Sequence, residues 1–224
     1  DAEWDNEYLS PTSRGFRLTN GGSTWVNENN SKFVYIAIRM SDGLVGKPPE
    51  AGTDAFAMDR ADGSSLPCFI SDFPVDFSYY RTTAASSEWY VGNRLKGTQY
   101  INTFSSSQVA TSNNFIWDYN NGWRASGLDS NWMAWMWKRG AGLDVVCYEG
   151  MSTARTLNHS LGGVPEMIWV RNLNWNVGWF TYHKGLNGGS NPINYGIGLS
   201  SAGAQYSYSQ LTDLTDSTFG YLNG

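Results

Sequence analysis

The stretch Trp132-Met133-Ala134-Trp135-Met136-Trp137-Lys138 decides the fold class of this chain. It is bounded by Asp129-Ser130-Asn131 and Gly140-Ala141-Gly142, so it is too short for a free-standing helix and is typical of a strand. Large residues stand at both odd and even positions, and therefore on both faces of that strand. Because such a strand must be covered on both sides, we expect it to lie centrally in a sheet of a sandwich.

The composition of the whole chain is typical of a protein made of strands and turns. The 224 residues include 11 Trp, 13 Tyr and 10 Phe, and Gly, Ser, Thr and Asn separate the apolar runs. No helical periodicity of useful length is present. We therefore predict an all-β fold, and the length suffices for one large β domain or two small ones.

Charge and hydropathy exclude several partners. The net charge of −5 and the isoelectric point near 4.9 argue against nucleic acid, because binding to phosphates depends on clustered Lys and Arg. No apolar run reaches the ~18–20 residues that cross a bilayer, so we expect no membrane insertion. Residues 1–5 do not resemble a signal peptide, and a chain that starts at Asp is expected to be processed or cut from a longer one. Cys68 and Cys147 leave a disulfide open, with buried free thiols as the alternative.

A diverged internal repeat of about a hundred residues runs through the chain. The segment Phe33-Val34-Tyr35-Ile36-Ala37-Ile38-Arg39 matches residues 132–138 position by position. Further pairs match in the same order: 16–18 with 115–117, 54–59 with 144–149, 73–81 with 164–171, and 89–94 with 179–184. In these pairs Glu166 is replaced by Val75, and the offset drifts because loops gain and lose residues more freely than strands do.

The phase of the repeat gives the predicted domain organisation. If each unit ends with a strand of the 132–138 type, residues 1–40 are the closing strands of a preceding repeat. Residues 41–139 are then one β-sandwich repeat, and residues 140–224 are a β-sandwich repeat that lacks its last strand. A sheet left open in this way invites strand addition. We expect residues 1–40 to complete a sandwich by strand exchange, within the chain or with a neighbour, unless the protein is longer at both ends.

Motifs in the second half resemble a known family. They are residues 132–138, 144–148, 155–162, 164–171 and 179–186. In this order they resemble the repeated lectin-like, concanavalin-like jelly-roll domains of structural and tail-fibre proteins of marine tailed phages. The resemblance implies tandem jelly-roll units on a virus particle and attaches no catalytic residue to these motifs. In the first repeat, Cys68 stands where the second has His159, and Asn93 stands where it has His183.

Residue patterns of common hydrolases are missing. His159 and His183 have no Glu or His at metal-ligand spacing, so we expect hydrogen-bonded histidines beside turns. A glycoside hydrolase needs two carboxylates across a cleft, and the candidates are Asp144, Glu149 and Glu166. On one regular strand Asp144 and Glu149 would point to opposite faces, so we interpret these acids as solvated edge residues. We therefore expect neither an enzyme nor a cofactor.

Turn signals separate the predicted strands. Asp62-Gly63, Asn121-Gly122 and Asn187-Gly188-Gly189 fall between apolar runs, where residues with positive φ close hairpins. Residues 59–63 and 118–122 also cluster carboxylate and amide oxygens, as a calcium loop does. Because turn chemistry alone explains Asp, Asn and Gly at these positions, we expect no bound metal.

A sugar-binding surface would need an exposed aromatic ring and nearby polar side chains. Trp117, Trp123 and Trp179 lie near Asn-rich turns, but the best candidate loop is Asn172-Leu173-Asn174-Trp175-Asn176-Val177-Gly178. The candidate glycan-binding residues are Asn172, Asn174, Trp175 and Asn176. The alternative is that Trp175 packs down as a lid on the sandwich core or against a neighbouring subunit.

The patterns favour a structural role. We expect a non-enzymatic structural or adhesive component of a virion or extracellular assembly, such as a fibre or a capsid decoration. The expected partners are other copies of the chain and other virion structural proteins, with host surface glycans as a further partner. The alternative class is a carbohydrate-binding, lectin-like module, and a glycoside hydrolase is less favoured.

Overall fold

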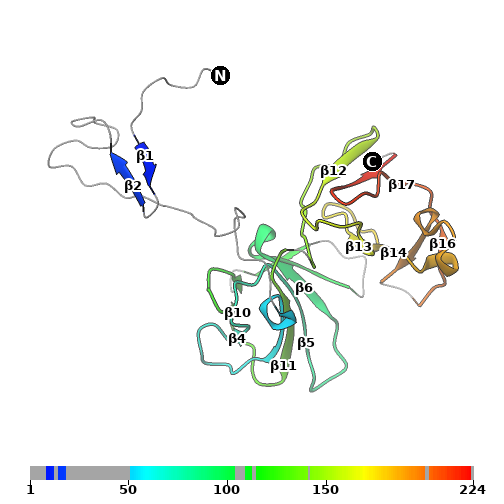
Figure 1. Ribbon diagram of the computed structural model, residues 1–224. Helices are drawn as coiled ribbons and strands as arrows, with labels where there is room; N and C mark the ends of the chain where they lie inside the picture. The colour runs from blue at the N-terminus through cyan, green and yellow to red at the C-terminus, as the bar shows by residue number, and fades with distance from the viewer. Residues whose placement is uncertain are drawn as a thin grey trace. The chain divides into compact units, whose positions relative to one another are not determined.

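The computed structural model describes the backbone of residues 9–12 and 15–18, and residues 51–103, 109–112, 115–140, 142–199 and 202–222 (Figure 1). The chain divides into two compact units, Asp1–Lys47 and Pro48–Gly224. In the first unit, β1 (Leu9–Thr12) pairs antiparallel with β2 (Gly15–Leu18). The predicted strand at residues 33–39 lies outside the described residues.

The second unit is built from short antiparallel strands, which confirms the predicted all-β class. The helical elements within the described ranges are short 3-10 turns: η1 (Gly52–Asp54), η2 (Arg94–Lys96), η3 (Leu186–Gly189) and η4 (Pro192–Asn194). None of the helices in the described part of the chain is long and apolar enough to cross a membrane.

Two sheets form the first lobe, which we define as residues 51–140. The larger sheet has the order β3 (Phe56–Arg60), β11 (Trp132–Trp137), β5 (Phe77–Thr82), β6 (Tyr90–Asn93), β7 (Gln99–Asn102) and β8 (Ala110–Thr111). The smaller sheet has the order β4 (Phe69–Ile70), β10 (Gly122–Ala125) and β9 (Phe115–Ile116). Side chains of both sheets meet in one core, with Trp123 and Phe69 from the smaller sheet and Met136 and Tyr80 from the larger.

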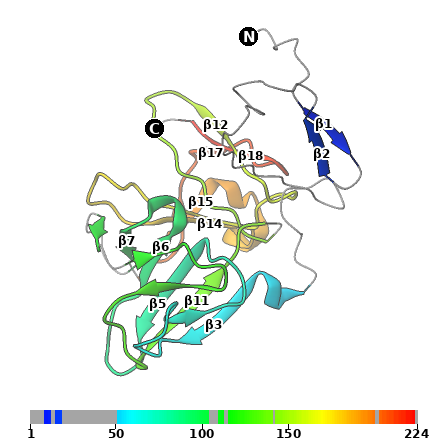
Figure 2. The same ribbon diagram turned by 90° about the vertical axis from the view of Figure 1, so that its left-hand side faces the viewer.

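Strand β11 lies inside the larger sheet, as its sequence predicts. It lies between β3 and β5 and pairs with both (Figure 2). In these ladders Trp135 is opposite Met58 on one side and Tyr79 on the other. Ala134 and Met136 point into the core and are fully buried. The alternate residues of β11 are half-buried on the opposite face of the sheet.

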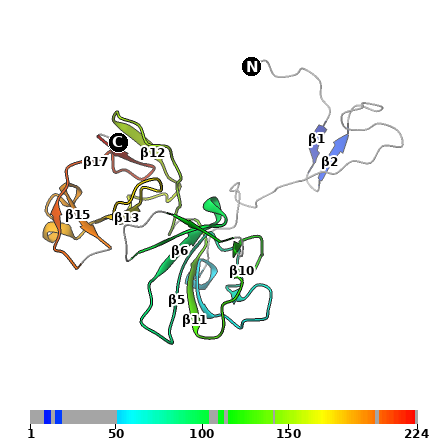
Figure 3. The same cartoon turned by 180° about the vertical axis from the view of Figure 1, so that it is seen from behind.

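The second lobe, residues 142–222, also contains two sheets (Figure 3). One has the order β12 (Arg155–Asn158), β18 (Thr218–Tyr221) and β17 (Leu211–Thr212). The other has the order β13 (Met167–Val170), β14 (Phe180–His183), β15 (Tyr195–Gly198) and β16 (Tyr206–Ser207). Leu157, Tyr182, Leu211 and Phe219 form the buried centre of this lobe.

The two lobes share a strand order. β4, β10 and β9 correspond in chain order and pairing to β12, β18 and β17, and the series β5 to β8 corresponds to the series β13 to β16. Counterparts of β3 and β11 are missing from the described residues of the second lobe. The expected match of residues 54–59 with 144–149 is therefore wrong as a match of strands, because residues 144–149 form no strand. The internal repeat itself stays a prediction.

Ladder registers correct one detail of the sequence matching. Phe77 is opposite Asn93 in the first lobe, and Met167 is opposite His183 in the second. Asn93 therefore does stand where His183 stands. The same registers make Asp76, rather than Val75, the counterpart of Glu166, so both lobes keep a carboxylate just before this strand.

Glycines account for turns at some of the predicted positions. Gly63, Gly188 and Gly189 have φ of 78°, 63° and 81°, as expected for turn residues. The expectation is wrong for Gly122, which lies within β10. Glycine is required there because a Cβ atom would lie 2.0 Å from the carbonyl oxygen of Phe69.

Candidate binding surfaces

The predicted glycan-binding loop connects β13 and β14, and its tryptophan is exposed to solvent. The carbonyl oxygen of the Asn172 side chain accepts hydrogen bonds from the backbone N–H groups of Asn174, at 2.9 Å, and Trp175, at 3.1 Å. The backbone N–H of Val177 donates to the Trp175 carbonyl at 2.9 Å. These bonds hold a tight turn, and Trp175 remains 69% exposed.

All four predicted contact residues lie on this loop, and Asn172, Asn174 and Asn176 are exposed like Trp175. The alternative that Trp175 packs as a lid on the core of its own chain does not agree with its exposure. An exposed indole beside amide side chains can stack on an apolar face and offer hydrogen bonds to hydroxyl groups.

The other tryptophans near Asn-rich turns belong to the interior. Trp117, Trp123 and Trp179 are 3%, 0% and 7% exposed. The indole N–H of Trp117 donates to the Gly97 carbonyl at 2.8 Å, and that of Trp179 donates to the Asn102 carbonyl at 3.0 Å. None of these three rings is free to stack on a sugar.

A second surface, which we call the outer aromatic face, lies on the side of the larger sheet that turns away from the first-lobe core. Its members are Phe56, Phe77, Tyr79, Trp89, Trp135 and Trp137, all half-buried. Trp89 stacks on Tyr79 at 4.2 Å between ring centroids and lies 4.6 Å from Trp135. The guanidinium carbon of Arg81 lies 5.0 Å from the centre of the Trp89 ring.

The second lobe covers part of the outer aromatic face. Trp169 of β13 contacts Phe77 and Tyr79 edge to face, at 6.4 and 6.3 Å. Trp179 packs with Val91 and Ile101, which lie on the same side of the sheet. Sequence reasoning missed this surface, although a signal was present: Trp135 and Trp137 are two residues apart on one strand and so share a face.

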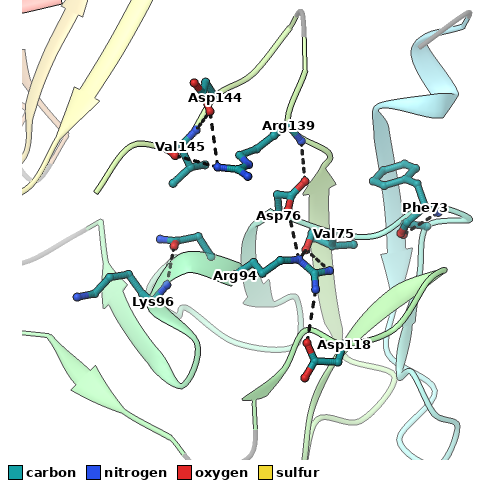
Figure 4. A network of polar contacts seen from close by, with 11 residues as sticks. Phe73, Val75, Asp76, Arg94, Lys96, Asp118, Arg139, Asp144 and Val145 are labelled. Atoms are coloured by element: carbon teal, nitrogen blue, oxygen red, sulfur yellow. Dashed lines mark hydrogen bonds and ion pairs between the residues drawn. The ribbon is translucent and has the colours of Figure 1, made fainter. Parts of the chain in front are cut away.

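A polar network lies at the end of the larger sheet where β5 begins and where β6 and β11 end (Figure 4). Arg94 donates through Nε and Nη2 to the Val75 carbonyl, at 3.2 and 3.0 Å, and pairs with Asp76 at 3.2 Å and Asp118 at 3.6 Å. The backbone N–H of Arg139 donates to the second oxygen of Asp76 at 2.9 Å. The carboxylate of Asp76 therefore ties the start of β5 to the end of β11.

The acids that were candidates for hydrolysis have structural partners. Asp144 accepts hydrogen bonds from the backbone and hydroxyl of Ser160, at 2.8 and 3.0 Å, and its side chain is 11% exposed. The expectation of a solvated edge residue is thus wrong for Asp144. It agrees with Glu166, whose side chain is 67% exposed. A hydrogen bond from Lys184 lowers the pKa of Glu166 below its usual value.

Both histidines are hydrogen-bonded beside turns, as expected. A ring nitrogen of His159 lies 3.3 Å from the Thr215 carbonyl, and Nδ1 of His183 accepts from the backbone N–H of Gly185 at 3.0 Å. In the part of the chain that the structure describes, no group of three or more His, Cys, Asp or Glu residues could hold a metal ion.

Cys68 and Cys147 are both free thiols, so no disulfide joins them. Cys68 is buried, and burial raises its pKa. Cys147 is exposed, so the reading of buried thiols is correct for Cys68 and wrong for Cys147.

The fold and these surfaces define an antiparallel, all-β protein of the sandwich class that presents aromatic side chains on a loop and on a sheet face. The sequence family described as "Domain of unknown function (DUF7483)" matches residues 90–223, more than half of the chain, and the chain belongs to that family. The match begins at β6 and covers the whole of the second lobe. Comparisons with curated proteins and with solved structures gave no match.

Proposed function

We propose that this protein is a non-enzymatic structural and adhesive component of an extracellular or virion-surface assembly. The observation that carries the proposal is Trp175, which is 69% exposed on a loop held by an Asx turn. Exposing a large apolar ring to water is unfavourable, and aromatic side chains presented in this way are the usual anchors of binding interfaces. A rigid turn also lowers the entropy lost on binding.

Substitution of Trp175 tests the adhesive role. We expect Trp175→Ala to weaken binding to the target by at least about tenfold, because truncating an anchoring aromatic typically costs ~2 kcal/mol or more. The measurement is binding of the purified chain to a glycan array and, in parallel, to the surface components of the assembly. The matched control is Val177→Ala, on the same loop and 46% exposed, which should leave binding unchanged.

Unfolding measurements on both variants separate a binding defect from a folding defect. A surface substitution at Trp175 should change the free energy of unfolding by less than about 0.5 kcal/mol. The adhesive role of Trp175 would be refuted by a stable Trp175→Ala variant that binds as the wild type does. Immunogold labelling that never detects the chain on particles or cell surfaces would refute the proposed location.

The second candidate function is carbohydrate binding, favoured by Asn172, Asn174 and Asn176 around the exposed ring. Amide side chains supply both donors and acceptors for sugar hydroxyls. Binding of the wild type to defined glycans, lost in Trp175→Ala, would favour this lectin-like function over a purely structural one. Release of reducing ends from oligosaccharides would instead indicate a hydrolase and would contradict the non-enzymatic proposal.

A further inference from the structure

Strand β3 is the edge strand of the larger sheet, beside β11 (Figure 2). Among the described residues it pairs with β11 alone. The backbone N–H of Ala61 continues this register and donates to the Trp132 carbonyl at 2.9 Å. Ladder bonds alternate along an antiparallel strand, so the backbone groups of Phe56, Met58 and Arg60 point away from β11.

One half of this free edge is closed by a side chain. The carboxylate of Asp59 accepts hydrogen bonds from the backbone N–H groups of Arg60, at 2.8 Å, and Ile70, at 2.7 Å. These bonds satisfy the edge at Arg60 and hold it against β4. Within the described ranges no side chain caps Phe56 or Met58 in this way, so the other half of the edge is open to strand addition.

A groove of about 380 Å³ lies beside the open half of the edge. Its lining residues come from η1, from β3 and from the segment that follows β4: Thr53, Phe56, Ala57, Met58, Ser71 and Asp72. The backbone N–H groups of Ser71 and Asp72 both donate to the Asn121 carbonyl, at 2.8 and 3.3 Å. The wall opposite β3 is therefore fixed, which lowers the cost of ordering on binding.

The open end of the groove is acidic. Asp72 is exposed, and its carboxylate makes no hydrogen bond or ion pair with another residue of the described ranges. Asp54 of η1 is a second exposed carboxylate. The cation of β3, Arg60, lies at the closed end, where its guanidinium donates to the Ser130 carbonyl at 3.2 Å. A partner with a Lys or Arg side chain near Asp72 is therefore favoured.

We propose that this groove binds an extended peptide of a partner protein as an added strand beside β3, with a basic side chain of the peptide beside Asp72. Backbone donors and acceptors at every second residue match the backbone of another extended chain. The side chain of Met58 is 58% exposed at the groove and offers an apolar contact to the peptide. This inference does not rest on the proposed adhesive function of Trp175.

Selection of peptides tests the groove. A library of random heptapeptides is depleted on full-length Met58→Pro and then selected on the wild type. Because the Met58 N–H points away from β11, proline removes the free donor and leaves the ladder between β3 and β11 in place. The surviving peptides should bind Met58→Pro at least about tenfold more weakly than the wild type.

Met58→Val is the matched control for this selection. Valine is close to proline in size and keeps the backbone N–H, so the selected peptides should bind this variant as they bind the wild type. The proposal would be overturned if no peptide survives the depletion, or if the surviving peptides bind Met58→Val as weakly as Met58→Pro.

Asp72→Asn tests the charge without changing β3. Asparagine tolerates the φ of 64° at this position. The selected peptides should be rich in Lys or Arg and should bind Asp72→Asn at least about threefold more weakly, with a smaller difference at high salt. Asp216→Asn, at an exposed carboxylate of the second lobe, should leave the affinity unchanged. Equal affinity of the wild type and Asp72→Asn would contradict the basic partner.

Methylated peptides test strand addition on the wild-type protein, so this measurement does not depend on the folding of a variant. Methyl groups are placed on alternate backbone nitrogens of a selected peptide, in either of the two possible frames. Only one frame removes donors that face β3. We expect that frame to abolish binding and the other to change the affinity by less than about threefold. Equal losses in both frames would overturn strand addition.

Sedimentation of the full-length chain distinguishes a partner peptide from a second copy. We expect the wild type and Met58→Pro to sediment alike. Self-association that is lost in Met58→Pro would place a second copy of β3 at this edge and would overturn the proposed partner.

Discussion

At the scale of single residues, a close approach between two strands restricts the residue type at a position more strictly than turn chemistry does. Gly122 is opposite Ile70 where β10 meets β4. A Cβ atom there would lie 2.0 Å from the carbonyl oxygen of Phe69 and 2.8 Å from the ring of Pro67. The backbone cannot open without separating β4 from β10, the strand that carries the fully buried ring of Trp123.

We therefore expect Gly122→Ala to destabilise the protein by about 3 kcal/mol, as severe overpacking does. Chemical denaturation monitored by tryptophan fluorescence measures the free energy of unfolding. Gly150→Ala is the control, because a Cβ atom at Gly150 meets nothing within 4 Å, and it should lie within about 0.5 kcal/mol of the wild type. Equal stability of the two variants would contradict the close approach of β4 and β10.

At the scale of elements, β11 holds the larger sheet together because it contributes to both faces. Met136 is fully buried in the core, while Trp135 and Trp137 lie on the outer aromatic face. Across the ladder from Trp135, Met58 of β3 is 58% exposed. The same side chain type therefore occurs in adjacent strands with opposite burial.

This pair of methionines gives a matched prediction. Met136→Ala should lower the free energy of unfolding by about 2–5 kcal/mol, through lost apolar burial and the cavity left behind. Met58→Ala should change it by less than about 0.5 kcal/mol. Thermal and urea unfolding of both variants measure the difference, and comparable losses would mean that β11 does not face the core as described.

The guanidinium of Arg94 joins elements through geometry that an ammonium cannot reproduce. Its Nε and Nη2 atoms share the Val75 carbonyl, and Nε also pairs with Asp76 (Figure 4). The side chain is 29% exposed, so water only partly screens these contacts. The planar fork therefore fixes the segment before β5 against the segment after β6.

Arg94→Lys should cost about 1–2 kcal/mol of unfolding free energy, because one carbonyl and one carboxylate lose their shared donor. The control is Lys96→Ala, which leaves the hydrogen bond between the Lys96 backbone and Asn93 in place. If Arg94→Lys is as stable as the wild type, a positive charge is sufficient at this position and the planar guanidinium is not required.

At the scale of the molecule, aromatic packing joins the two lobes of the second unit. Trp179 is 7% exposed, donates to the Asn102 carbonyl and packs with Val91 and Ile101 of the first lobe. Trp169 adds contacts to Phe77 and Tyr79. Each lobe also has a core of its own. Coupling between the lobes therefore depends on few large side chains.

Removal of one such side chain should uncouple the lobes. We expect Trp179→Ala to lower stability by about 3–5 kcal/mol and to separate one calorimetric transition into two, as each core then unfolds independently. Trp175→Ala is the matched control, because that ring is exposed and its removal should preserve a single transition. One unchanged transition in Trp179→Ala would contradict coupling through this ring.

Sequence patterns predicted the local features of the fold, but they did not predict features that depend on residues distant in the chain. The large side chains at both odd and even positions of residues 132–138 predicted a central strand, and the polar surroundings of Trp175 predicted an exposed loop. Trp117 and Trp123 have similar polar neighbours in sequence and are nevertheless buried at 3% and 0%. Their environment depends on strands far away in the chain, as does the burial of Asp144 against Ser160.

The sequence by itself determined the all-β class, the place of β11 and the turn that presents Trp175, because strand periodicity and turn chemistry are local properties of the chain. Tertiary structure alone decided which aromatic rings are covered. A strand shows two faces, and which one is buried depends on the sheet that packs against it. The half-buried outer aromatic face therefore emerges only when the sheets are assembled.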